Sequence, residues 1–211
     1  MLRMANLEER LQKTYAAHGV GREQRESIQT FLNLLARKDR ATYEHSVRVG
    51  MLAAAIGEHL QLDAKALLYA GLLHDAGKSL VSKETLTKTE GFGKKEFDEM
   101  KPHPLDAHRL LRGIHDFSAD IAVRHHHFQE KGYPENLPEY LHAYGEPTKA
   151  RIDHYARLLS LADFYDAAST RVNDAHGVKR KLTDAEVRNL MIAKHPGLEQ
   201  LINELYDKKI F

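Results

Sequence analysis

The sequence Leu-Leu-His-Asp-Ala-Gly-Lys at residues 72–78 places an imidazole and a carboxylate side by side within an apolar segment. A carboxylate can bridge two metal ions while each imidazole serves one ion, so His74 and Asp75 together favour a metal centre. Further candidate ligands lie on both sides of this pair along the chain, at His45, His103, His125-His126-His127 and Asp163. If these residues converge in space, the protein is a metal-dependent hydrolase.

Apolar residues repeat with helical spacing around three of these candidates. One stripe begins at His45 and continues through Val49, Leu52, Ile56 and Leu60. A second stripe, beside His74, consists of Ala66, Ala70, Leu73 and Gly77, and a third consists of Ile152, Ala156, Leu159, Asp163 and Ala167. Steps of three and four place each candidate on the buried side of a different helix. A buried charge is costly unless it is paired or bound to a metal, and bundles build metal sites from inward-facing side chains of several helices.

The rest of the chain also has the pattern of helices and loops. Further helices are expected at residues 5–17, 23–38, 94–112, 117–127, 183–194 and 197–208, with loops at 81–93 and 132–148. Thr183 and Glu186 have the spacing of a capping box, and Gly77 is expected to end the helix that carries His74. No alternating run is long enough to predict a sheet. We therefore expect an all-α fold, with a main helical domain at residues 41–211 and a helical extension at residues 1–40 packed on it.

Composition excludes several classes of function. The 211 residues fit one domain, and 31 Lys and Arg against 30 Asp and Glu give no electrostatic argument for binding nucleic acid or a membrane surface. The chain has no cysteine, which excludes thiol catalysis, disulfides and cysteine-ligated metals. The first ten residues are too charged for a signal peptide, and no apolar run approaches the length of a membrane span. A cytoplasmic protein is the expectation.

Five sequence elements occur in an order that is typical of a known family. Residues 72–78 are similar to a Leu-Leu-His-Asp-Ile-Gly-Lys element, and His103-Pro104 is similar to a mid-domain His-Pro element. The histidine triplet followed by Gly132-Tyr133-Pro134 resembles paired histidines with a Gly-Tyr-Pro motif, and residues 161–167 with Arg171 resemble an Ala-Asp-Val-Phe-Asp-Ala…Arg element. With His45, these elements resemble the HD-GYP branch of the HD-domain superfamily of metal-dependent phosphohydrolases over roughly residues 40–172.

The resemblance implies an HD-domain helical bundle with a dinuclear centre. It implies that a hydroxide bridging two divalent ions attacks the phosphorus of a nucleotide or cyclic dinucleotide, with cyclic di-GMP as one candidate. Iron or manganese suits mixed imidazole and carboxylate ligands best, with zinc or magnesium less favoured. Asp75 would bridge the ions, and Lys78, Tyr133 and Arg171 would contact the substrate. The implied metal ligands are His45, His74, Asp75, His103, His126, His127 and Asp163.

The sequence departs from the family pattern after the histidine triplet. Phe128 stands where the family has glutamate, and only Gln129-Glu130-Lys131 separates it from the Gly-Tyr-Pro motif, two residues fewer than in the family. The triplet leaves open which two histidines are ligands, and the apolar lead-in at residues 121–123 favours His126 and His127. Ala41 stands where some family members carry the glutamate ligand of a third metal, so two ions are expected.

Two alternative functions remain at this stage. A mononuclear HD-type nucleotidase would use only His45, His74, Asp75 and Asp163, and substitution of His103 would leave its activity largely intact. A catalytically degenerate module would instead sense a nucleotide or engage a partner through residues 128–150. The apolar residues of the first two helices, Leu7, Leu11, Tyr15, Ile28, Phe31, Leu32 and Leu35, could pack on the main domain or on a second copy, so a homodimer stays open.

Overall fold

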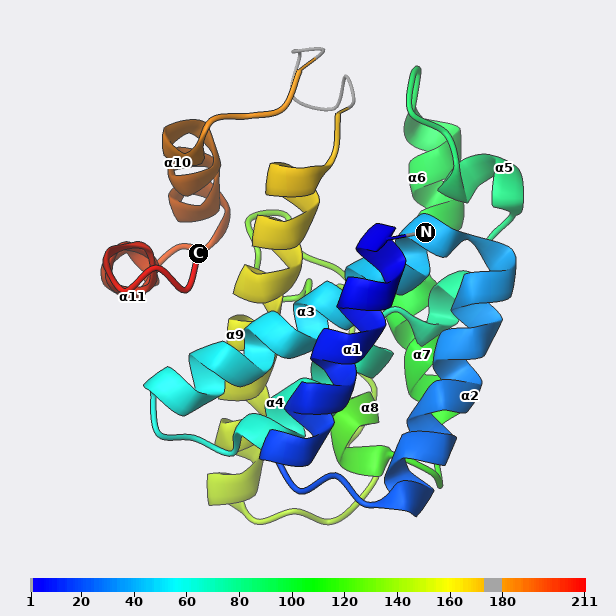
Figure 1. The fold of residues 1–211 in the computed structure, drawn as a ribbon, viewed down its shortest axis with the longest axis vertical. Coiled ribbons are helices and arrows are strands. Elements are labelled where there is room, and N and C mark those ends of the chain that lie inside the picture. Colours follow the sequence, from blue (N-terminus) through cyan, green and yellow to red (C-terminus); the bar gives the residue numbers. More distant parts are fainter. Residues whose placement is uncertain (1, 173–179) are drawn as a thin grey trace.

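The computed structural model describes residues 2–172 and 180–211, which form helices and connecting segments without a strand (Figure 1). The prediction of an all-α fold is therefore confirmed. In chain order the elements are α1 (Leu2–Ala17), α2 (Arg22–Lys38), α3 (Arg40–His59), α4 (Ala64–Leu73), the 3-10 helix η1 (Ala76–Leu80), α5 (Lys83–Leu86), α6 (Lys94–Met100), α7 (His103–Leu111), α8 (Asp116–Ala122), α9 (Glu146–Thr170), α10 (Asp184–Lys194) and α11 (Glu199–Asp207).

Helices α3, α4 and α9 form the centre of the bundle. Asp39 and Asp63 cap the first turns of α3 and α4 by accepting hydrogen bonds from backbone N–H groups. The two helices cross at Gly50 and Gly71, where a Cβ on Gly71 would lie 2.6 Å from the Gly50 Cα. Only glycine permits this backbone contact. The crossing therefore sets the distance between His45, just before it on α3, and the end of α4.

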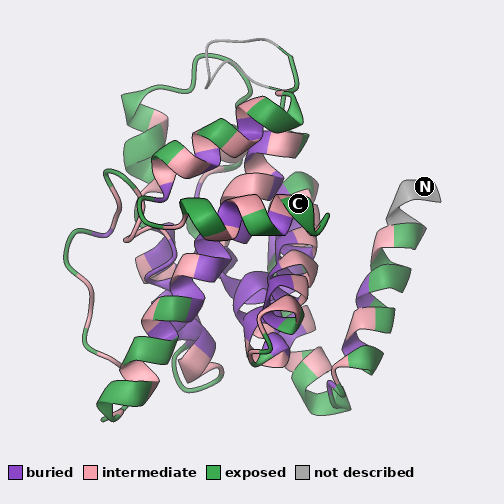
Figure 2. Cartoon of the chain, turned by 90° about the vertical axis from the view of Figure 1, so that its left-hand side faces the viewer, coloured by how far each residue is buried: buried purple, intermediate pink, exposed green. Residues whose placement is uncertain are grey.

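The N-terminal helices pack on the same chain. Leu11, Ile28 and Leu32 are fully buried in one cluster with Val47 and Leu68 of α3 and α4. In Figure 2 the buried residues of α1, the helix that ends at the N label, face the bundle. The apolar stripes of α1 and α2 thus face α3, α4 and η1, while the domain boundary at residue 40 stays a prediction.

The C-terminal helices α10 and α11 cover the other side of α9. The predicted capping box is present, because the Thr183 hydroxyl accepts from the Glu186 N–H and the Glu186 carboxylate accepts from the Thr183 N–H. Val187 and Met191 of α10 and Leu205 of α11 are buried in the cluster that contains the α9 core residues. Figure 1 shows this pair beside α9, on the opposite side from α2 and α7.

Three predicted helix boundaries were wrong. The helix expected at residues 94–112 is interrupted at Pro102, which lacks an N–H and restricts the residue before it, so α6 and α7 are separate. The helix expected at 117–127 ends at Ala122, and residues 123–128 form turns. Gly77 does not end α4, which stops at Leu73. Because Gly77 has no side chain, η1 can instead contact α7; a Cβ on Gly77 would lie 2.1 Å from the His103 carbonyl oxygen.

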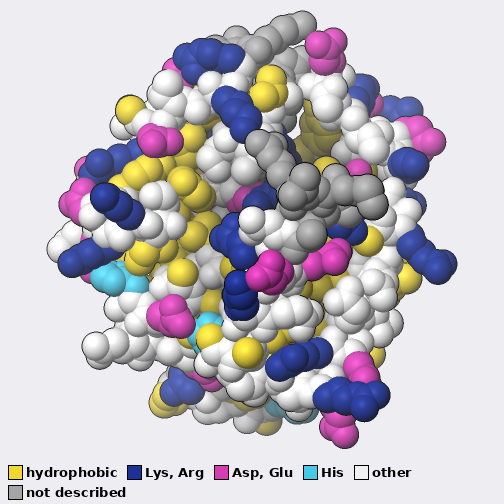
Figure 3. All heavy atoms as spheres, viewed as in Figure 1, with side chains coloured by type: hydrophobic (Ala, Val, Ile, Leu, Met, Phe, Trp, Pro, Cys, Tyr) yellow, Lys and Arg dark blue, Asp and Glu magenta, His cyan; other side chains and the backbone are white. Residues whose placement is uncertain are grey.

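The described surface gives no sign of a membrane-spanning element. No helix within residues 2–172 and 180–211 combines the length and apolar character needed to cross a bilayer. On the face seen in Figure 3, basic and acidic side chains are interspersed and histidine is scarce. The candidate ligands His45, His74, His103 and His125 are buried inside the bundle.

Candidate metal centre

Three central elements bring His45, His74 and Asp163 together. His45 lies on α3, Asp163 lies on α9, and His74 directly follows α4. His45 Nε2 is 3.0 Å from Asp163 Oδ1, and His74 Nε2 is 3.8 Å from the same oxygen. The three predicted stripes therefore meet at one point, as the sequence implied.

A second group of histidines faces the first across Asp75. His103 begins α7, and His125 and His126 occupy the turns after α8. The ring of His103 lies 5.6 Å from that of His125 and 5.3 Å from that of His126. Asp75 directs Oδ1 to His103 Nε2 at 3.4 Å, while its Oδ2 lies 3.6 Å from His45 Nε2. The Asp75 carboxylate thus contacts both groups of candidate ligands.

Backbone carbonyls fix the orientation of three of these imidazoles. The Nδ1 atoms of His74, His103 and His125 lie within hydrogen-bond distance of the carbonyl oxygens of Gly71, Met100 and Ala122, each three residues earlier. Because a carbonyl only accepts, each Nδ1 must carry the proton and donate it. The Nε2 lone pair of each neutral ring is then free to bind a metal ion.

The polar atoms at the centre fit a metal site because they lack protein partners. Buried polar atoms are nearly always hydrogen-bonded, and leaving them unpaired is costly. Here many unpaired buried donor atoms converge, and overlapping groups of three lie within 4.8 Å of one another. The unpaired atoms are Nε2 of His45, His74, His103 and His125, Nδ1 of His126 and Oδ1 of Asp75.

Electrostatics favour neutral histidines on one side of Asp75 and positive charge on the other. Burial lowers the pKa of His125 to about 4 and holds the pKa of His103 and His126 well below the ordinary value. Burial would also lower the pKa of His74, but the charges of Asp75 and Asp163 outweigh it and raise that pKa. The negative charges of the two carboxylates therefore favour a positive charge at this point, which a divalent ion would supply.

Acid should destabilise the metal-free protein between about pH 6.5 and about 4. The folded-state pKa of His125, about 4, lies below the ordinary value of 6.5, so the folded state binds fewer protons in this window. The neutral His125 ring therefore contributes folding stability that is complete above the unfolded-state pKa and is lost as the pH falls through the folded-state pKa. His74 acts in the opposite sense, but His103 and His126 reinforce His125.

We expect the thermal unfolding midpoint of chelator-treated protein to fall as the pH is lowered. A His125→Gln variant should show a shallower fall, and a midpoint independent of pH would contradict the prediction.

The other predicted site residues differ in their distance from the centre. Lys78 Nζ is 2.6 Å from Asp75 Oδ2, so its ammonium group belongs to the centre. The ring of Tyr133 lies 4.6 Å from that of His126, which places this tyrosine directly beside it. Arg171 is exposed and follows the end of α9, about 12 Å along the helix axis from Asp163.

The structure groups His125 with the centre in place of His127. The sequence left the ligand pair open and favoured His126 and His127 from the apolar lead-in at residues 121–123. Because α8 ends at Ala122, the following turns aim His125 inward, and His125 Nε2 is 3.9 Å from Asp163 Oδ2. His127 belongs to none of the candidate ligand groups among the described residues, and its Nδ1 donates a hydrogen bond to the Pro134 carbonyl at 2.8 Å.

Two residues beside the centre had no role in the sequence interpretation. Asp166 accepts a hydrogen bond from His45 Nδ1 at 2.7 Å, and Arg48 donates to both oxygens of Asp166. Their spacing offered a signal, because Arg48 follows His45 by three residues and Asp166 follows Asp163 by three. Residues three apart share a helix face.

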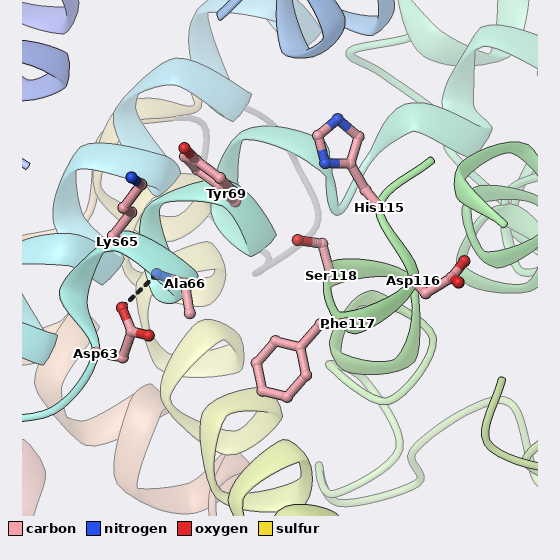
Figure 4. A pocket seen from close by; sticks show the side chains of 8 residues that line it. All are labelled: Asp63, Lys65, Ala66, Tyr69, His115, Asp116, Phe117 and Ser118. Atoms are coloured by element: carbon pink, nitrogen blue, oxygen red, sulfur yellow. Dashed lines mark hydrogen bonds between the residues drawn. The ribbon is translucent and has the colours of Figure 1, made fainter. Parts of the chain in front are cut away.

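The centre is nearly closed, and one surface pocket lies away from it. This pocket, of about 300 Å³, lies between the beginnings of α4 and α8. Its lining side chains, drawn in Figure 4, are those of Asp63, Lys65, Ala66, Tyr69, His115, Asp116, Phe117 and Ser118. None of these residues belongs to the metal centre. Access to the centre is marked by the side chains of His126, Lys78 and Asp163, which remain 13, 12 and 10% exposed.

An all-helical bundle that gathers buried imidazole and carboxylate donors from several helices defines a class of metal-binding helical proteins. Residues 42–168 match the model of the HD domain family, and this segment is more than half of the chain. The chain therefore belongs to the HD domain family, which confirms the family expected from the sequence.

Relatives with assigned activities are phosphodiesterases. The chain is 32% identical over 143 residues, or 64% of its length, to a cyclic di-GMP phosphodiesterase of Pseudomonas aeruginosa. It is 29% identical over 173 residues, or 78% of this chain, to the cyclic di-GMP phosphodiesterase response regulator RpfG of Xanthomonas campestris. It is also 27% identical over 165 residues, or 75% of this chain, to the 3'3'-cGAMP-specific phosphodiesterase 1 of Vibrio cholerae. The matched regions are only 32, 43 and 35% of these relatives.

A solved structure supports the fold. The HD domain of the phosphodiesterase PgpH of L. monocytogenes, in complex with cyclic di-AMP, superposes with a TM-score of 0.51 at 17% identity. The superposition covers 86% of this chain and 85% of that one. The phosphodiesterase activity named for the three sequence relatives is thus the activity of proteins of which this chain spans less than half.

Proposed function

We propose that the chain hydrolyses a phosphodiester bond of a cyclic dinucleotide at a centre that holds two divalent ions. The observation that carries the proposal is the convergence of candidate ligands around Asp75, with His45, His74 and Asp163 in one group and His103, His125 and His126 in another. One nitrogen of each of these histidines is buried and unpaired, as is Oδ1 of Asp75. The relatives are named as phosphodiesterases of cyclic di-GMP and 3'3'-cGAMP, which supports a cyclic dinucleotide as the substrate.

The donor set favours iron or manganese. All candidate ligand atoms are imidazole nitrogens or carboxylate oxygens, and this mixture suits iron or manganese. Thiolate ligands, which would favour zinc, are absent because the chain has no cysteine. When bound, two such ions would neutralise charge on phosphoryl oxygens and make a bound water acidic enough to be deprotonated near neutral pH.

The chain's own residues would orient the substrate phosphate. His126, Lys78 and Asp163 lie at the partly exposed edge of the centre, so the phosphate would enter there. Lys78 already donates to Asp75 and has further N–H donors available for a phosphoryl oxygen. The surrounding apolar core would exclude bulk water and strengthen these contacts.

An aromatic column leads from the centre to the surface and would hold a nucleobase. The ring of His126 packs on Tyr133 at 4.6 Å, and Tyr133 meets Phe97 of α6 edge to face at 5.8 Å. Phe97 ends the column with 42% of its surface exposed. An exposed ring beside a phosphate site is a stacking surface for any base.

Replacing Phe97 with alanine is expected to weaken substrate binding. Stacking of one base on an aromatic ring contributes roughly 1–3 kcal/mol, so KM for a cyclic dinucleotide should rise about 5- to 150-fold. Hydrolysis of bis(p-nitrophenyl) phosphate, which has no base, should be unchanged. Phe92→Ala is the matched control, because Phe92 is 40% exposed but lies outside the column. Equal effects of both variants on KM would contradict the assignment.

The function is tested by metal analysis and hydrolysis on the same preparation. Protein purified without a chelator should contain about two equivalents of iron or manganese. It should linearise cyclic di-GMP, 3'3'-cGAMP or cyclic di-AMP, lose activity with a chelator and regain it with added metal. One ion, with activity surviving His103→Ala, would indicate the mononuclear nucleotidase. Tight nucleotide binding without turnover would indicate the sensing module.

A further inference from the structure

His45 differs from the other buried histidines in the partner of its Nδ1 atom. His74, His103 and His125 donate to backbone carbonyls, whereas His45 donates to the carboxylate of Asp166 at 2.7 Å. In the neutral ring, Nε2 then carries the lone pair that could bind a metal ion, and this atom lies 3.0 Å from Asp163 Oδ1. A carboxylate partner increases the basicity of a ligating imidazole and fixes its orientation.

Arg48 holds the Asp166 carboxylate in place. Its guanidinium donates from Nε to Oδ1 at 2.6 Å and from Nη2 to Oδ2 at 2.8 Å, a two-point contact that restrains both position and plane. Asp166 is buried, while Arg48 reaches the protein surface with its side chain 32% exposed. The positive charge of Arg48 balances Asp166, so the pair orients His45 without adding net charge to the centre.

We propose that Asp166, fixed by Arg48, is a positioning residue for one of the two metal positions, the one formed by His45, His74 and Asp163. This inference rests on the proposed metal centre and adds that its two positions are unequal. The position near His103 and His125 relies on carbonyl-supported imidazoles. The position near His45 has a carboxylate-supported imidazole, and Asp163 lies nearer to it, with an oxygen 3.0 Å from His45 Nε2 against 3.9 Å from His125 Nε2. It is therefore the tighter of the two.

The test is a manganese titration of the full chain, treated beforehand with a chelator, in which the heat of binding is measured by calorimetry. Wild-type protein should bind two ions in two resolved steps. Asp166→Asn keeps the size of the side chain but removes its charge, and should weaken the tighter step about 10- to 100-fold while leaving the other step unchanged. Asp116→Asn is the matched control, because Asp116 also pairs with a histidine at 2.7 Å, the exposed His142, outside the centre. Both steps should be unaffected in this control.

The outcomes separate this inference from the proposed function. Wild-type protein that binds no manganese would overturn the metal centre itself. Two normal steps in a folded Asp166→Asn variant would overturn only the role of Asp166, as would equal weakening of both steps. If Asp166→Asn fails to fold by circular dichroism, Arg48→Gln decides, because it leaves Asp166 in place but releases its carboxylate. Weakening of one step supports the inference, and two unchanged steps overturn it.

Discussion

Replacing Asp75 with asparagine is expected to lower kcat for cyclic dinucleotide hydrolysis by roughly a thousandfold, because metal-assisted charge stabilisation contributes several kcal/mol. Asp75 contacts both ligand groups, through Oδ1 toward His103 and Oδ2 toward His45. An amide has the same shape but no charge, and only one of its two terminal atoms can bind a metal. The variant should therefore also retain less metal, as measured by elemental analysis.

The control for Asp75 is another fully buried carboxylate with a cationic neighbour. Asp120 lies 3.5 Å from the Arg124 guanidinium and outside the ligand groups. Asp120→Asn should lower the thermal unfolding midpoint but keep the metal content. Asp75→Asn protein that is folded, holds two ions and turns over at the wild-type rate would remove Asp75 from the proposed mechanism.

Substitution of His125 should be far more damaging than substitution of its neighbour His127. His125→Ala removes an inward-facing Nε2 and is expected to cost about one metal equivalent. Loss of a direct ligand should exceed the 10- to 100-fold affinity loss that is typical of removing an outer partner. His127→Ala removes only a hydrogen bond to the Pro134 carbonyl, so kcat/KM should stay within about threefold.

The same pair of variants discriminates between the sequence interpretation and the structure. Both are measured for metal content and for kcat/KM under one set of conditions, with circular dichroism to confirm folding. Metal loss in His127→Ala protein, with His125→Ala intact, would restore the ligand pair that the sequence favoured. Metal loss in both variants would mean that the turns after α8 rearrange when metal binds.

Much of the fold could be predicted because helical periodicity depends on local sequence. The stripes around His45 and Asp163 located α3 and α9 and predicted that a polar residue on each would face the interior. The order of the five sequence elements then indicated the family. Breaks within helices were harder to predict, because apolar residues continue with the same spacing on both sides of Pro102.

The departures within the site have a common physical origin. The apolar lead-in at residues 121–123 favoured His126 and His127, whereas His125 faces the centre because α8 ends at Ala122 and the backbone turns there; the ligand pair stays a prediction. Asp166 and Arg48 were missed because their roles depend on the crossing of α3 and α9, which no local pattern specifies. The role of Arg171, the domain boundary at residue 40 and the homodimer stay predictions.

The Asp166–His45 contact also bears on the order in which the protein becomes able to hold metal during synthesis. The two residues are separated by 121 positions along the chain. A nascent chain that has emerged only as far as α8 contains His45, His74 and His103 but neither Asp163 nor Asp166. The tighter metal position is therefore completed only when α9 leaves the ribosome, so tight metal acquisition at this position follows the synthesis of α9.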